Sequence, residues 1–277
     1  MDLYWIYDMP TWYVGFGLKV LFIGISVALL IATRGIIAKH LQLSHDLDQS
    51  VSAVFGAIGM IFGLFLGLIA VEAWENRDKL DDLISQEASS VIQLYRSVSV
   101  LKDPDHRDVL EEIKGYTENL IQVAWPAYKR GEVLDDGESI ITQIHQKITA
   151  MEPKTSDQAV AYEAVVSSFV DMTRARSLRI DSANICIPKP FWFVIMGGSL
   201  MSIPILYFLN VPSLRLHVIF MVAYTFYLSG IVTLIAVLDN PMRGRISASS
   251  APFSRAMRAM VQIDQVKEPT GVSRAHH

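Results

Sequence analysis

The stretch VSAVFGAIGMIFGLFLGLIAV, residues 51–71, contains no ionisable side chain, and the charged stretch EAWENRDKLDDLISQE, residues 72–87, follows it directly. About 20 consecutive apolar residues of α-helix cross the hydrocarbon core of a bilayer. Residues 51–71 therefore predict a membrane span. Apolar residues continue at helical spacing from Leu80 to Leu101, with no Pro or Gly in between. We therefore expect the span to continue beyond the membrane as one long helix.

Three further apolar stretches are long enough to cross a bilayer, and just over half of the 277 residues are hydrophobic. These stretches are residues 13–33, 191–210 and 216–238. The predicted fold is all-α, with four transmembrane helices and a helical domain inserted between the second and third. The predicted regions are 1–71 for the first two spans, 72–190 for the inserted domain, 191–239 for the last two spans and 240–277 for a C-terminal tail.

The inserted domain shows the spacing and the end signals of several helices. Asp103-Pro104 provides a cap and a first-turn proline for a second helix, Trp125-Pro126 predicts a bend in it, and Gly131 predicts its end. A short helix follows around Ile144, and Ser156 is the expected cap of a last long helix that runs towards the third span. The insertion is therefore expected to form a helical bundle.

Basic residues close to the spans predict the orientation, because they collect on the cytoplasmic side of a membrane. The side that holds both termini and the insertion carries Arg77, Lys79, Arg174, Arg176, Arg179, Lys189, Arg243 and Arg245, whereas the short loops opposite carry Arg34, Lys39 and Arg215. Both termini and the insertion are therefore expected in the cytoplasm, with the spans in the cell (inner) membrane of a bacterium.

Several functional classes lack their sequence signals. A net charge of -4 and the absence of a basic run interleaved with aromatic residues argue against a nucleic-acid partner. The sequence contains no nucleophile elbow, Walker loop, HExxH or dinucleotide fingerprint. His40 and His45 lie five residues apart, which is off the one-face spacing of helical metal ligands. We therefore predict no enzyme activity, no cofactor and no metal site.

Two faces of the 51–71 helix differ in composition. Gly56, Gly59, Gly63 and Gly67 recur at steps of three, four and four and share one face, which lets helix backbones approach closely. Met60, Leu64 and Leu68 recur at steps of four on the neighbouring face. The glycines fit ordinary packing between spans. They also fit a helix that meets copies of itself around an axis, so that the neighbouring face lines a narrow apolar throat.

Beyond this face the helix becomes acidic, with six acids against two basic residues between Glu72 and Glu87. Glu72, Glu75, Asp78 and Asp82 are the candidate lining of a vestibule, in which a negative potential would concentrate cations. The alternative is a solvated face that is partly paired with arginines of the last long helix, Arg174, Arg176 and Arg179.

Two short stretches resemble the bestrophins. Phe65-Leu66-Gly67-Leu68, followed by Glu72-Ala73-Trp74-Glu75-Asn76-Arg77, resembles the end of the bestrophin pore helix, and Leu238-Asp239-Asn240-Pro241 resembles the segment after the last bestrophin span. The chain is more similar still to bacterial membrane proteins classed as bestrophin-like, from about Gly56 to Phe253. The similarity there lies in the Ala-Trp-Glu-Asn step, Trp125-Pro126, Ser213 to His217, Asp239-x-Pro241 and Ala251-Pro252-Phe253.

The resemblance implies a homo-oligomeric ion channel, pentameric in bestrophins, with the second span of each subunit around the axis. Its throat positions correspond to Met60, Leu64 and Leu68. The acidic cluster that binds calcium in animal bestrophins is missing, because residues 243–258 are basic. Calcium gating is therefore not expected.

The leading hypothesis is an oligomeric, hydrophobically gated channel with a lean towards cations, whose partners are its own copies, membrane lipid and the permeant ions. The alternative is a non-conducting membrane scaffold or sensor whose helical bundle binds a partner protein.

Overall fold

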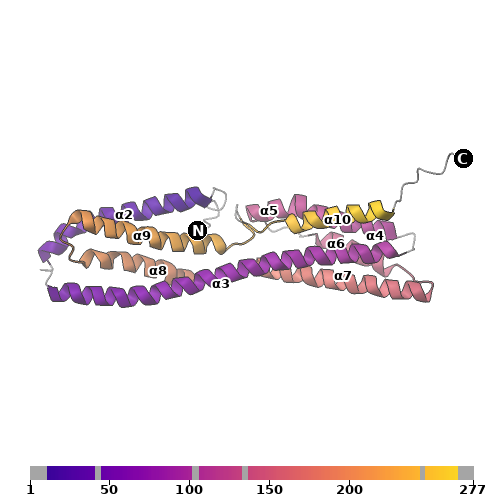
Figure 1. The fold of residues 1–277 in the computed structure, drawn as a ribbon, viewed down its shortest axis with the longest axis horizontal. Coiled ribbons are helices and arrows are strands. Elements are labelled where there is room, and N and C mark those ends of the chain that lie inside the picture. Colours follow the sequence, from indigo (N-terminus) through magenta and orange to yellow (C-terminus); the bar gives the residue numbers. More distant parts are fainter. Residues whose placement is uncertain (1–10, 41–44, 102–105, 133–136, 244–246, 268–277) are drawn as a thin grey trace. The chain divides into compact units, whose positions relative to one another are not determined.

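The computed structural model describes residues 11–40, 45–101, 106–132, 137–243 and 247–267, and their regular elements are all helical (Figure 1). The chain divides into two compact units, which are the described residues of Met1–Asn76 with Ile185–Ile246 and those of Arg77–Asn184 with Ser247–His277. One uninterrupted helix, α3 (His45–Val100), belongs to both. The expected continuation of the second span into a long helix is confirmed.

The first unit contains the apolar helices. They are α2 (Thr11–His40), the first part of α3, α8 (Lys189–Ile205) with a 3-10 turn at Leu206–Phe208, and α9 (Leu214–Leu238). By length and composition, four helices of the described chain could cross a membrane. α2 packs along α9, as Figure 1 shows. The predicted all-α class and the four long apolar helices are confirmed.

Aromatic side chains hold α3 against the other apolar helices. The ring of Phe55 meets that of Tyr224 edge to face at 5.5 Å, and the rings of Phe65 and Phe191 stack at 6.2 Å. The ring of Phe62 lies against Gly198 so closely that a Cβ atom there would overlap it. One side of α3 is therefore committed to packing within the subunit.

The second unit is a bundle around the rest of α3. Its other elements are α4 (His106–Asn119), a π-helical turn at Leu120–Ala124, α5 (Trp125–Arg130), α6 (Glu138–Thr149), α7 (Ser156–Ala183) and α10 (Ala251–Lys267). Ile84, Val91, Leu94 and Val98 place the apolar row of α3 in the core, at most 1% exposed. The helical spacing of the insertion thus reflects burial.

Local details of the bundle refine the sequence analysis. The distortion at Trp125-Pro126 is a π-helical turn just before Trp125, and α5 ends at Gly131, whose positive φ of 76° suits a residue without a Cβ. The expected Ser156 cap is wrong by one residue, because Thr155 is the cap and its hydroxyl accepts the Gln158 N–H. The segment from 251 to 267 is helical, which the sequence analysis did not predict. Asp103-Pro104 and the side chains of His40 and His45 lie outside the described residues.

Candidate functional site

The three candidate throat residues all face outwards in the single subunit. Met60 is 74% exposed, Leu64 66% and Leu68 62%. Steps of four residues turn by about 40° each on an α-helix, so the three side chains lie within about 80° of one another. A continuous apolar row of this kind is covered by lipid or by protein in the functional molecule.

The glycine row next to this face is open. At Gly56, Gly59, Gly63 and Gly67, no atom of another part of the subunit lies within 4 Å of the position that a Cβ would take. None of the four is therefore required by a close contact inside one subunit. The close contact within the subunit falls at Gly198 of α8, a residue that the sequence analysis did not single out.

The four candidate vestibule acids, Glu72, Glu75, Asp78 and Asp82, are exposed on α3. Of the arginines that could have paired with the acidic stretch, Arg179 does pair with one of its members, Glu87, whereas Arg176 Nη1 lies 2.8 Å from Glu138 Oε2 of α6. Glu87, which the sequence analysis counted with the acidic stretch, is fully buried and belongs to the bundle core.

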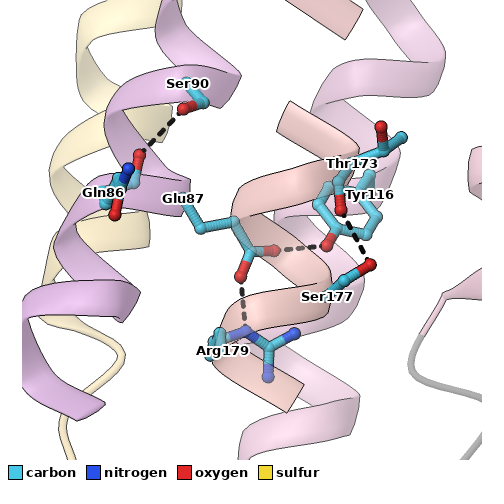
Figure 2. Close-up of polar contacts among 7 residues, drawn as sticks. All are labelled: Gln86, Glu87, Ser90, Tyr116, Thr173, Ser177 and Arg179. Carbon is cyan, nitrogen blue, oxygen red and sulfur yellow. Dashed lines mark hydrogen bonds and ion pairs between the residues drawn. The ribbon is translucent and has the colours of Figure 1, made fainter. Parts of the chain in front are cut away.

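Glu87 is the centre of a buried polar cluster that joins three helices (Figure 2). Its carboxylate accepts a hydrogen bond of 2.5 Å from the Tyr116 hydroxyl of α4 and another from the Nε–H of Arg179 on α7. All three side chains are at most 1% exposed. A buried carboxylate is tolerated only when it is paired and hydrogen-bonded, and both oxygens of Glu87 have a partner.

Burial also changes the ionisation of this cluster. Removal from water, with the Glu87 charge beside it, raises the pKa of Tyr116 well above its ordinary value. Tyr116 therefore remains a hydrogen-bond donor to Glu87 across the physiological pH range. The cluster carries one negative and one positive charge in a dry environment. A sequence signal for it existed: Glu87 lies three residues after Ile84 and four before Val91, which places an acid at a core position.

The Trp125-Pro126 and Ala251-Pro252-Phe253 motifs lie next to each other in the bundle. The Trp125 ring meets the Phe253 ring edge to face at 5.4 Å, and its Nε1–H donates to the Ala248 carbonyl over 2.9 Å. The Arg179 guanidinium carbon lies 5.6 Å from the centre of the same indole. Trp125 thus contacts both the C-terminal segment and the buried ion pair.

Asp239 connects the end of α9 to the beginning of α8. Its carboxylate accepts the Ile187 backbone N–H at 2.6 Å and the Trp192 Nε1–H at 3.2 Å. Burial raises the pKa of this carboxyl, although the two hydrogen bonds oppose that shift. The Asp239-x-Pro241 motif therefore has a structural role at the junction of two apolar helices.

Among the described residues, no three His, Cys, Asp or Glu side chains come together in a way that could hold a metal ion. The described residues thus offer positioned helices, buried polar clusters and an exposed apolar row.

Comparison with known proteins identifies the type of domain. The bestrophin-like domain model matches residues 20–253. A crystal structure of a bacterial bestrophin homolog from Klebsiella pneumoniae that carries a single mutation superposes with a TM-score of 0.69 at 13% identity, covering 90% of this chain and 98% of that one. A second structure of that homolog, phased on zinc, has a TM-score of 0.69 at 12% identity and covers 90% and 97%. None of the curated protein sequences compared matches the chain. At this identity the superpositions show a shared fold.

Proposed function

This chain belongs to the bestrophin-like family, and from that premise we propose that it forms an oligomeric ion channel in which copies of α3 surround a hydrophobic throat. The main observation in support of this throat is the outward-facing row of Met60, Leu64 and Leu68, each more than 60% exposed. The opposite side of the helix packs on α9 through Phe55 and on α8 through Phe62. Copies arranged around an axis would bring the three side chains together, and rings of apolar side chains gate ions by dewetting.

The flanks of the throat face differ in a way that suits contacts between copies in a ring. At about 100° per residue, the four glycines lie on one flank, and Ile61, which is 67% exposed, lies on the other. In a head-to-tail ring, one flank of each subunit meets the opposite flank of the next. The open glycine row can receive the Ile61 side chain of a neighbouring copy. The resemblance to bestrophins favours five copies.

The exposed acids give the proposed channel a preference for cations. Glu72, Glu75, Asp78 and Asp82 follow the throat residues along α3 and are repeated once per copy. Rings of Asp and Glu side chains attract cations, because the field of several like charges adds in a confined space.

The membrane setting completes the proposal. Residues 72–190 and both termini lie in the cytoplasm, the spans lie in a bacterial inner membrane, and lipid covers the apolar surfaces that neighbouring copies leave free. The basic residues beside the spans support this orientation.

Reconstitution of the purified oligomer into planar bilayers tests the proposal. We expect current through the parent protein, and a larger open probability for Met60→Ala and Leu64→Ala, because smaller side chains widen and hydrate the throat. Leu200→Ala on α8 is the matched control, since Leu200 is 73% exposed but lies on another helix. A reversal potential near that of the cation supports the acidic vestibule, and one that follows chloride rejects it.

The symmetry of the particle provides an independent measurement. A ring with an axial opening lined by α3 supports the channel. A two-fold dimer that buries the glycine row and carries no current would instead favour the non-conducting scaffold.

A further inference from the structure

We propose that α10 acts as a cover on the buried Glu87–Arg179 ion pair, so that docking and undocking of α10 control how firmly α3 is held in the helical domain. The coupling inside the domain stands independently of conduction. Its effect on an ionic current rests on the proposed channel function.

A single indole ring connects the cover with the ion pair. The Arg179 guanidinium carbon lies 5.6 Å from the Trp125 ring centre, the Phe253 ring lies 5.4 Å from it, and the indole N–H donates to the Ala248 carbonyl. Loss of the C-terminal segment would remove two of these contacts at once. Trp125 would then be free to move away from Arg179.

The ion pair depends on being kept dry. Glu87 and Phe253 are fully buried, Arg179 is 1% exposed and Trp125 2%. The attraction between two charges falls as the surrounding dielectric rises, so water that enters beside Trp125 weakens the pair. Phe253 and Trp125 therefore stabilise the link from α3 to α7 by excluding water.

α10 is held by an apolar row and by one acidic side chain. Its buried side is a short row of Phe253, Ala256 and Met260, two of which have large side chains. Two polar contacts lie near its other end, where Asp264 accepts the Tyr95 hydroxyl at 2.5 Å and pairs with Lys114 at 2.9 Å. A non-helical segment at residues 247–250 precedes the helix.

The position of Glu87 on α3 explains why its release matters. Glu87 follows Asp78 by nine residues, which is a turn of about 180° on an α-helix. The buried pair thus holds the side of α3 opposite to an exposed acid. If the pair weakens, α3 loses a polar connection to α7. The hydrogen bond from the Tyr116 hydroxyl to Glu87, which connects α3 to α4, would weaken with it.

The π-helical turn at Leu120–Ala124 lies directly before Trp125. Such turns interrupt the regular hydrogen-bond ladder and occur often at functional sites. It provides a place where the backbone can change as the indole moves.

Hydrogen–deuterium exchange on the full-length protein in detergent tests the coupling. We expect Phe253→Ala to raise the exchange rate of residues 84–91 of α3 and 176–182 of α7 by about tenfold or more, since local opening becomes easier. Val261→Ala is the matched control, because Val261 lies on the outer side of α10 and is 45% exposed. It should exchange like the parent in these segments.

Two additions make the outcome decisive. Phe253→Leu keeps most of the apolar volume, so it serves if the alanine variant does not fold, and a smaller rise in the same segments is expected. In a Glu87→Gln background, the additional effect of Phe253→Leu on α3 should shrink, because the pair that it protects is already lost.

Faster exchange confined to α10, or rates in α3 equal to those of the parent in both Phe253 variants, would overturn the proposal. A rise that Val261→Ala reproduces would overturn it as well. Failure of the channel hypothesis would appear separately, as an oligomer that shows this exchange pattern but carries no current.

Discussion

The two parts of α3 treat their distinctive residues in opposite ways. Around Met60 and Leu64 the helix turns large apolar side chains outwards and leaves its glycines open, whereas around Glu87 it buries a charge and gives both carboxylate oxygens a partner. The buried charge of the helical domain therefore finds its partners within one subunit. The exposed row of Met60, Leu64 and Leu68 has no such partners within the subunit, and in the proposed function other copies of the chain contact it.

The largest expected change in stability concerns the buried Glu87 in the helical domain. Glu87→Ala leaves the Arg179 charge and the Tyr116 hydroxyl buried without their acceptor, and removing one member of a buried pair costs about 3–5 kcal/mol. We expect a correspondingly lower unfolding free energy in denaturant titrations. Glu163→Ala, at an exposed site on α7, should change it by less than about 0.5 kcal/mol. Equal losses in the two variants would contradict a special role for Glu87.

A pair of glycine substitutions separates packing inside the subunit from packing between copies. Gly198→Ala forces a Cβ into the Phe62 ring and should destabilise the subunit by about 1–3 kcal/mol, as overpacking does. Gly63→Ala meets open space inside a helix, where Ala is more favourable than Gly by about 0.5–1 kcal/mol, so it should slightly raise the thermal stability of a dissociated subunit while it weakens the oligomer. Melting curves and light scattering on both variants measure the two effects. An oligomer unaffected by Gly63→Ala would remove the glycine row from the proposed interface.

A smaller effect is expected where α7 begins. Thr155→Ala removes the hydroxyl that accepts the Gln158 N–H, and the loss of such a cap costs about 1 kcal/mol. Ser156→Ala, one residue later, should change the stability by less than about 0.5 kcal/mol, because Ser156 already lies inside the helix, where Ala is at least as favourable as Ser. Thermal melting of the two variants compares neighbouring hydroxyls directly, and the reverse order would show that the cap is misassigned.

The smallest effect concerns pH and Asp239. Its pKa is higher in the folded protein than in the unfolded chain, so the folded state binds this proton more tightly and gains relative stability as pH falls through the raised pKa. Asp239→Asn cannot bind the proton and should flatten this part of the stability profile. Melting temperatures of parent and variant between about pH 7 and pH 4, where ordinary aspartates begin to protonate, measure the difference. Parallel profiles would rule out Asp239 as the source.

The sequence predicted the parts of the fold that depend on local pattern. The unbroken apolar spacing between Leu80 and Leu101 sufficed to predict the long α3, and the run at 51–71 sufficed for its apolar part. The missed helix at Ala251–Lys267 has only the short apolar row of Phe253, Ala256 and Met260 to identify it. Thr155 and Ser156 are adjacent hydroxyls, and the sequence alone does not distinguish which of them caps the helix.

In the candidate site, too, the local sequence pattern predicted some features, and contacts between distant residues determined the others. The common face of Met60, Leu64 and Leu68 follows from their spacing on one helix, but its exposure was known only from the structure, and its use depends on other copies. Arg179 was named as a possible partner of the acidic stretch, but the burial of Glu87 and its contact with Tyr116 were missed, because Tyr116 and Arg179 are 29 and 92 residues away in the chain. Contacts over such distances depend on tertiary packing, which the local pattern of charges does not report.

The carboxylate at the end of α9 has a consequence for how the protein is made. Asp239 lies 52 residues after Ile187, whose N–H it accepts. At synthesis rates of 5–20 residues per second, on the order of 3–10 s separates the translation of the two residues. During that interval the ribosome delivers α8 without its partner at the start of the helix. The two last helices can therefore reach their final mutual arrangement in the bilayer only after the whole hairpin has been synthesised.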